Sequence, residues 1–217
     1  MKKRIIITIL IVAILIIGIG FVCYYNIPRL SYEYSNEYDG YIVVKAYGNS
    51  ESYNIPTTYK NKKVVGIGTR AFMGHDDLEK IIFDEPSNII VIEKLAFSEC
   101  EELEYINLEY VQYIERNAFS YCYKLNNLKV GALHIGASAF FKCESLDNFE
   151  LVGDLISIGS MAISYTAIRE IKLPRSTEIV YDDCFLYAYS LRSIVVYGNN
   201  LLENEYLRTL KMVTYVG

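Results

Sequence analysis

The sequence predicts a β-rich α/β solenoid of about six units of 21–25 residues, with short strands and short helical turns, preceded by one transmembrane helix. Three observations support this fold class. An Ala-Phe pair, or a variant of it, recurs with spacings of 25, 22, 21, 23 and 22 residues. An aliphatic residue stands five positions before the second member of each pair, and an apolar-x-x-apolar-x-apolar segment follows each pair. A fixed period of this length is typical of solenoids, in which a unit buries its apolar face only by stacking on its neighbours.

The first expected element is a membrane anchor at residues 5–23, which follows a cytoplasmic tail at residues 1–4. These nineteen residues are almost all apolar, and as a helix they would span about 28 Å, close to the thickness of a bilayer core. Three basic residues precede the run, so the positive-inside rule places the N-terminus in the cytoplasm and the repeats outside it. Two alternatives remain open: a cleaved signal peptide, which would give a secreted protein, and lipidation at Cys23.

The next elements are assigned from composition. Residues 24–40 are polar and rich in Tyr, which favours a juxtamembrane spacer. Residues 41–66 contain apolar stretches that favour a strand-rich N-terminal cap, and residues 67–198 hold the repeats. Residues 199–217 are expected to form a C-terminal cap, with a short amphipathic helix between Leu201 and Leu210 followed by a last strand. Caps are needed because the end rungs of a solenoid would otherwise expose apolar core.

Within each repeat, the apolar-x-x-apolar-x-apolar segment predicts a short strand. Its last residues alternate, so that Ile106 and Leu108 point into the core while Tyr105 and Asn107 point outward. The Ala-Phe segment is expected on the opposite side of the rung as a helical turn or bend. Parallel rungs about 4.8 Å apart would stack into a rod about 30 Å long.

The repeat resembles the BspA-type leucine-rich repeats of bacterial surface proteins. The closest matches to the pattern of that family are GIGTRAF at residues 66–72 and IGASAF at residues 135–140. The lead-in at residues 41–65 also resembles the strand-rich segment that such arrays carry. The resemblance implies a leucine-rich-repeat fold and a role in surface recognition or adhesion, and it identifies no ligand, because solenoids are scaffolds whose exposed residues decide the partner.

One repeat position is occupied by His75, Cys100, Cys122 and Cys143 in successive units. A zinc site is disfavoured, because equivalent positions lie in a line with about 5 Å between rungs, whereas zinc needs four ligands around one point. The four residues are therefore interpreted as a structural ladder of small buried side chains. Disulfides between adjacent rungs are also disfavoured, since in-register Cβ atoms lie too far apart.

The composition argues against several function classes. The net charge is −5, and without residues 1–23 it becomes 18 − 26 = −8, so no basic surface is available for nucleic acid. The sequence contains two His and none of the phosphate-loop, zinc-protease or serine-hydrolase motifs. We therefore expect no enzymatic activity, no cofactor and no metal.

The outward positions of the strands form the candidate protein-binding face. Arg169, Lys172 and Arg192 are expected to lie together at its C-terminal end. Tyr and mixed charges on one face suit protein recognition. The alternative is an ordinary solvated sheet face whose charges provide solubility. The candidate residues are Tyr105, Asn107, Tyr110, Lys129, Glu150, Arg169, Lys172, Arg192 and Tyr197.

The functional hypothesis combines the anchor with this face. It describes a non-catalytic module for adhesion or recognition at the cell surface, whose partner is a protein of a host, a neighbouring cell or the envelope. The alternatives are an envelope scaffold that organises other membrane proteins, and an accessory to a partner that carries the activity.

Overall fold

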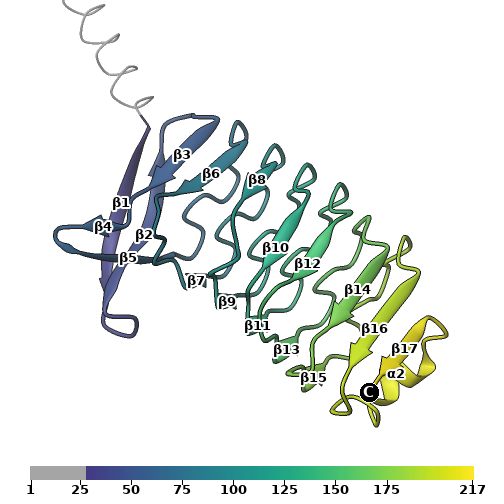
Figure 1. Ribbon diagram of the computed structural model, residues 1–217. Helices are drawn as coiled ribbons and strands as arrows, with labels where there is room; N and C mark the ends of the chain where they lie inside the picture. Colours follow the sequence, from purple (N-terminus) through teal and green to yellow (C-terminus); the bar gives the residue numbers. More distant parts are fainter. Residues whose placement is uncertain (1–27) are drawn as a thin grey trace, which may run out of the picture.

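The structure is a computed structural model that describes residues 28–217, and it is a rod of stacked rungs (Figure 1). The predicted β-rich solenoid is confirmed. It has about eight turns, two more than the repeat units counted in the sequence, because the predicted caps are themselves turns of the rod. The N-terminal rungs lie at one end of the rod and the C-terminal helix and strand at the other (Figure 1).

The strands are short, and most contain two to four residues. In chain order the elements are β1 (Arg29–Ser35), β2 (Gly40–Tyr47), β3 (Ser52–Ile55), β4 (Thr58–Tyr59), β5 (Lys62–Ile67), β6 (Lys80–Phe83), β7 (Val91–Ile92), β8 (Tyr105–Ile106), β9 (Tyr113–Ile114), β10 (Leu128–Val130), β11 (His134–Ile135), β12 (Phe149–Leu151), β13 (Ser157–Ile158), β14 (Glu170–Leu173), β15 (Ile179–Val180), β16 (Ser193–Tyr197), α2 (Glu205–Thr209) and β17 (Val213–Val216).

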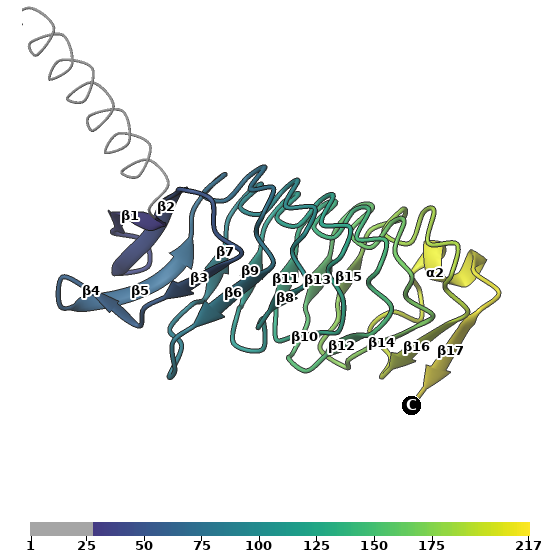
Figure 2. The same ribbon diagram turned by 90° about the horizontal axis from the view of Figure 1, so that it is seen from above.

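Two rows of strands run along the rod (Figure 2). The first, here called the long sheet, has the order β1-β2-β5-β7-β9-β11-β13-β15, with β4 paired to β5. The second, here called the segmented sheet, consists of β3-β6-β8, β10-β12 and β14-β16-β17. The segmented sheet contains the strands predicted from the repeat. The two-residue strands of the long sheet were not predicted, because two residues are too few to show an alternation of apolar and polar side chains.

The Ala-Phe segments are turns, so the predicted helical turns are wrong, whereas the alternative of a non-helical bend on the opposite side of the rung agrees with the structure. The N–H of Phe97 donates to Ala118 O at 2.8 Å and the N–H of Phe119 donates to Ala139 O at 2.8 Å, so these bonds join neighbouring rungs instead of closing a helix. Two residues of each of the first five turns also have positive φ, for example Asn117 at 58° and Tyr121 at 65°. Such residues cannot continue a right-handed helix. Among residues 28–217, α2 is the one α-helix.

The core is a column of stacked side chains along the axis of the rod. The rings of Phe72, Phe97, Phe119 and Phe140 stack with centroids 5.0, 5.3 and 5.3 Å apart. All four rings are buried, as are the Ala residues that precede them. A small Ala is required because its carbonyl accepts the inter-rung hydrogen bond described above, which brings the backbones of adjacent rungs close together.

The N-terminal end is closed by a hairpin. Strand β1 pairs antiparallel with β2, from Arg29 opposite Tyr47 to Ser35 opposite Gly40. Part of the segment predicted as a spacer at residues 24–40 is therefore an edge strand of the long sheet. Its Leu30 and Tyr32 pack against the core, and these apolar side chains explain why the segment folds.

The predicted membrane anchor concerns a different part of the chain. Within residues 28–217 no helix is both long and apolar enough to cross a bilayer. The predicted tail at residues 1–4 and anchor at residues 5–23 lie outside the described residues, as does Cys23.

The C-terminal end adds one more turn. Asn204 caps α2 by accepting a hydrogen bond from the N–H of Leu207 at 2.8 Å, and Leu207 is fully buried over the last rung. Strand β17 then pairs in parallel with β16. The predicted helix and final strand are both present, although the helix is shorter than the range from Leu201 to Leu210.

Candidate functional site

The candidate protein-binding face is the exposed side of the segmented sheet, and we call it the strand face. Alternation along each strand builds it: in β10, Leu128 and Val130 are buried while Lys129 is exposed. In β14, Glu170 and Lys172 are exposed while Ile171 and Leu173 are buried. Outward residues of adjacent rungs lie in register, for example Lys129 opposite Glu150. The outward residues of successive rungs therefore form lines along the rod, which we call files. The file that contains Lys129, Glu150 and Lys172 is the central file.

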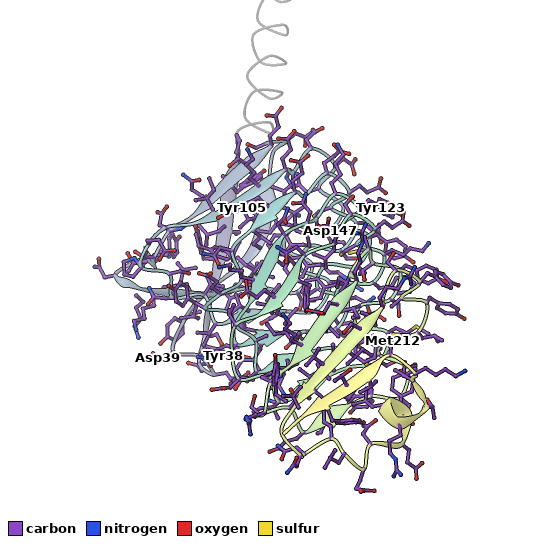
Figure 3. All side chains as sticks on the ribbon, turned by 45° about the vertical axis from the view of Figure 1, so that its right-hand side comes forward. Tyr38, Asp39, Tyr105, Tyr123, Asp147 and Met212 are labelled. Carbon is purple, nitrogen blue, oxygen red and sulfur yellow. The ribbon has the colours of Figure 1, made fainter. Side chains whose placement is uncertain are left out.

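Two hollows lie on the strand face. The larger, of about 490 Å³, lies over β12 and β14 and is lined by Glu150, Arg169, Glu170, Lys172 and Tyr197, among other residues. The smaller, of about 330 Å³, is lined by Tyr105, Asn107, Glu109, Asn127 and Lys129, among other residues. Seven of the nine candidate residues line one hollow or the other. In Figure 3, Tyr105 and Asp147 mark this side of the rod, whereas Tyr38 and Asp39 lie in the turn between β1 and β2.

Charges alternate along the central file of the strand face. The Nζ atom of Lys129 lies 3.9 Å from Glu109 and 3.8 Å from Glu150, and Lys172 Nζ lies 3.0 Å from Glu170. The hydrogen bond to Glu170 raises the pKa of Lys172, and Glu150 and Tyr197 add smaller effects in the same direction. The charged side chains of these pairs are exposed or partly exposed, so solvent screens each pair and it contributes little to stability.

Two candidate residues lie outside the hollows. Arg192 does not join Arg169 and Lys172, because its Nη1 atom donates to Tyr189 O at 2.9 Å and to Leu191 O at 3.2 Å. Tyr110 lies in the turn after β8 and is 61% exposed. The predicted basic cluster is therefore a mixed-charge hollow, in which Arg169 and Lys172 face the carboxylates of the same strands.

Asn107 is partly exposed and also makes a structural contact. Its Oδ1 atom accepts a hydrogen bond from the N–H of Glu109 at 2.9 Å, which closes a small turn after β8. Tyr105, by contrast, is 53% exposed. Of these two neighbours, the tyrosine is the better candidate for direct contact with a partner, because a large ring with a polar tip supplies contact area.

The cysteines of the ladder are buried and lie one above another. Each thiol donates to the carbonyl of a Phe in the preceding rung: Cys100 to Phe72 at 3.0 Å, Cys122 to Phe97 at 3.1 Å and Cys143 to Phe119 at 3.2 Å. Burial raises the pKa of the Cys100 thiol to about 12, and it also raises the pKa values of Cys122 and Cys143. These thiols are protonated at neutral pH, and they are free in the structure.

His75 occupies the ladder position of the first unit and makes different contacts. Its Nε2 atom lies 2.9 Å from the hydroxyl of Tyr53, and that hydroxyl donates to the backbone carbonyl of Gly48 at 2.8 Å or of Tyr47 at 2.9 Å. The side chain is half-buried, and burial lowers its pKa. His75 therefore links the first repeat to the strands of the N-terminal cap.

Sequence reasoning overlooked a row of aromatic residues on the turns. Tyr121, Tyr165 and Tyr187 stand two positions after the second member of their Ala-Phe pairs, and this spacing would have revealed them. Phe141 lies between the first two, with centroids 5.6 Å from Tyr121 and 5.4 Å from Tyr165. The rings of Tyr165 and Tyr187 stack at 4.9 Å. Because these rings pack on one another, we infer that the row stabilises the turns.

The chemistry available on the strand face is non-covalent. Among residues 28–217, no group of three His, Cys, Asp or Glu side chains has a geometry that could hold a metal ion. Nothing in this part of the chain gives positive evidence of catalysis. The hollows offer guanidinium, ammonium and carboxylate groups beside tyrosine rings, which is the mixture found at protein interfaces.

Comparison with known proteins identifies relatives of the whole repeat array. Residues 41–133 and 131–207 match the family described as BspA type Leucine rich repeat region, with six copies. A leucine rich cell surface protein from Faecalibacterium prausnitzii A2-165 is similar in structure, with a TM-score of 0.61, 22% sequence identity, and coverage of 77% of this chain and 52% of that chain. The T. pallidum Leucine Rich Repeat protein has a TM-score of 0.53, 23% identity, and coverage of 76% of this chain and 68% of that chain.

These structural relatives are too distant to indicate more than a shared fold. The chain spans about half the length of the F. prausnitzii protein, with 52% of that protein covered. No curated protein matches the chain.

Proposed function

Because the chain belongs to the BspA-type leucine-rich-repeat family, we propose that it is a non-catalytic protein-binding module displayed at the bacterial cell surface. The observation that carries the proposal is the strand face, where Tyr105, Arg169, Lys172 and Tyr197 surround two hollows among alternating charges. Support for the location comes from the F. prausnitzii relative, whose own description is that of a cell surface protein.

The proposed mode of binding uses the spacing of the rungs. A partner that lies along the rod would meet a lysine or a carboxylate at each step of the file Lys129, Glu150, Lys172. Alternating charges of this kind provide specificity and orientation more than affinity, because wrongly placed like charges are penalised. The tyrosines beside the hollows would supply most of the affinity.

We also propose that residues 5–23 anchor the module, with the N-terminus in the cytoplasm. The support is the apolar composition of that segment and the basic residues before it. Washing membranes with alkaline carbonate should leave the full chain in the membrane fraction, and its N-terminal residues should be intact by mass spectrometry. A chain that lacks residues 1–23 in the medium would instead support the signal-peptide alternative.

Site-specific photo-crosslinking in native cells tests the binding face. A photoreactive amino acid at position 105 or 172 should form a crosslink to a specific protein, whereas the same group at position 189 should not. Tyr189 is a suitable control because it lies on the turns, is 71% exposed and is outside both hollows. The double substitution Arg169→Ala with Lys172→Ala should reduce the crosslink at position 105 by about tenfold.

The identity of the crosslinked protein distinguishes adhesion from scaffolding. A protein of another cell or of the surroundings would support adhesion, and a membrane protein of the same cell would support an envelope scaffold. Equal crosslinking from positions 105, 172 and 189 would contradict the strand face as the binding surface.

A further inference from the structure

The long sheet carries a depression around Gly136 and Gly159, which we call the notch and which is separate from the strand face. The notch arises at one repeat position, the residue that follows the buried aliphatic side chain of each long-sheet strand. In chain order this position is held by Gly68, Glu93, Glu115, Gly136, Gly159 and Tyr181. Two glycines therefore stand side by side along the rod, with a carboxylate before them and a tyrosine after them.

The two glutamates at this position bond the backbone of the preceding rung. Glu93 accepts a hydrogen bond from the N–H of Thr69 at 2.8 Å, and Glu115 accepts one from the N–H of Lys94 at 3.0 Å. In each case the carboxylate belongs to one rung and the N–H to the rung before it. In these two rungs the side chain of the column thus satisfies one backbone donor of the rung before it.

The two glycines leave the corresponding donors uncovered. By the same pattern, Gly136 lies against the N–H of Arg116 and Gly159 against the N–H of Ala137. A Cβ atom placed on either glycine would lie 2.6 Å from the nitrogen concerned, so glycine is required for the rungs to approach so closely. Within the described part of the chain, neither N–H has an acceptor.

These donors open into a cavity of about 550 Å³ with aromatic walls. Tyr113 and Tyr181 line it from the long sheet, and Tyr38 lines it from the turn between β1 and β2 (Figure 3). The ring of Tyr113 stacks on His134 at 5.6 Å, and His134 Nδ1 lies 2.9 Å from the hydroxyl of Ser157. The floor consists of the glycine backbone. A concave site with aromatic walls and a few polar groups is the usual form of a small-ligand site.

The charges around the notch limit the kind of ligand. Glu37 and Glu93 lie near Tyr38 and Glu115, as their effects on the pKa values of these two residues indicate, and Asp182 follows Tyr181. This acidic surrounding disfavours an anion. A cation is disfavoured by Arg116, which lines the notch, and by two N–H groups that require acceptors.

An uncharged ligand that both donates and accepts hydrogen bonds would match the backbone N–H groups, the carboxylates and the tyrosine rings of the notch. Hydroxyl or acetamido oxygens would accept from the N–H groups of Arg116 and Ala137, and hydroxyl protons would bond Glu115. The apolar faces of sugar rings would pack on the tyrosines. We propose that the notch binds a neutral carbohydrate, with Tyr113 and Tyr181 as the stacking residues and the uncovered N–H groups of Arg116 and Ala137 as donors.

Isothermal titration calorimetry of the full chain with defined oligomers tests the proposal. The neutral probes are tetra-N-acetylglucosamine and cellotetraose, the anionic probe is tetragalacturonate and the cationic probe is tetralysine, all at neutral pH and physiological salt. We expect a neutral tetrasaccharide to bind at least tenfold more tightly than either charged probe. The substitution Tyr181→Ala should weaken that binding by about tenfold.

Matched variants keep the test independent of folding. Tyr189→Ala removes an exposed tyrosine of the same repeat from outside the notch and should leave binding unchanged. Glu115→Gln replaces the charged acceptor of the proposed sugar contact with a neutral one, so binding of a neutral sugar should weaken but persist, whereas binding of tetralysine through the carboxylate would be lost. No binding of either neutral probe, equal effects of Tyr181→Ala and Tyr189→Ala, or preferred binding of tetralysine that Glu115→Gln abolishes would each overturn the proposal.

Discussion

The central rungs of the solenoid repeat one set of contacts, whereas the last two rungs replace those contacts one by one. Between Phe97 and Cys143, each rung stacks a Phe on the next and bonds a thiol to a carbonyl of the preceding rung. In the fifth rung Ile163 ends the Phe stack, and Thr166 bonds the carbonyl of its own rung at 2.9 Å. Stability in a solenoid is approximately a sum over neighbouring rungs, so the loss of inter-rung contacts should make the C-terminal end weaker.

The largest difference is expected for the aromatic core. Phe119 is fully buried between two other rings, so Phe119→Ala should lower the free energy of unfolding by about 3–5 kcal/mol. Among residues 28–217 the ring of Phe185 stacks on Tyr206 alone, at 6.3 Å, and Phe185 is 6% exposed, so Phe185→Ala should lower the free energy of unfolding by less. Urea denaturation monitored by circular dichroism measures both values. Equal losses would mean that the centre and the C-terminal end of the rod are equally well packed.

Cysteine labelling should reveal the same gradient without any substitution. Cys122 and Cys184 are both fully buried and both have raised pKa values because of burial, so neither reacts until its rung opens. We expect Cys184 to be alkylated at least tenfold faster than Cys122 in native buffer, because end rungs open more easily. Peptide mass spectrometry after timed treatment with iodoacetamide gives the two rates. Faster labelling at Cys122 would reverse the proposed order.

Buried serines should respond with opposite signs in the two regions. Ser120 lies 2.9 Å from the Ser98 hydroxyl and also bonds Asn117 O at 3.2 Å, so Ser120→Ala should cost about 1 kcal/mol. Ser164 is fully buried in the fifth rung, and its hydroxyl is without a hydrogen-bond partner among the described residues. Ser164→Ala should therefore be neutral or stabilise the protein, because an unsatisfied buried hydroxyl is removed. Destabilisation by Ser164→Ala comparable to that of Ser120→Ala would contradict this distinction.

The smallest effect concerns the first rung, where His75 stands in place of a cysteine. Burial lowers its pKa in the folded state below the ordinary value of 6.5, although Gly48, Asp76 and Asp77 oppose the shift. Below pH 6.5 the unfolded chain therefore binds more protons at this site, so the stability that the neutral side chain contributes falls as the pH drops through the folded pKa. Thermal unfolding at pH 7.5 and pH 5.5 should show this loss, and His75→Gln should reduce it. An identical pH dependence in both proteins would exclude His75 as the cause.

The side chains buried in the core could be predicted from the sequence because each core position recurs at the same place in successive repeat units. The Ala and Phe columns are apolar in every unit and buried throughout, and Cys100, Cys122 and Cys143 are buried as well. The strands of the segmented sheet were predicted for a similar reason, since alternation over three or four residues indicates which side chains point inward. The folding of β1 was not predicted, because its sequence is largely polar and its Leu30 and Tyr32 find their partners only when β1 pairs with β2 and packs against the core.

The candidate sites divide in the same way. The outward residues of the strand face follow from the alternation, so that seven of the nine candidates line its hollows. The position of Arg192 did not follow, because its guanidinium bonds backbone carbonyls that the sequence does not place near it. Nor did the notch follow, because it depends on a hydrogen bond between the side chain of one rung and the backbone of another.

The sequence by itself determined the solenoid, the order of its rungs and the side chains of its core, because a strict period leaves one register in which all apolar positions stack. The tertiary structure decided where the turns place their backbone donors. The N–H of Thr69 is covered because a glutamate follows 24 residues later, and the N–H of Arg116 is open because Gly136 stands at the equivalent position. That difference is visible only when neighbouring rungs are set side by side, since the donor and its acceptor belong to different turns of the chain.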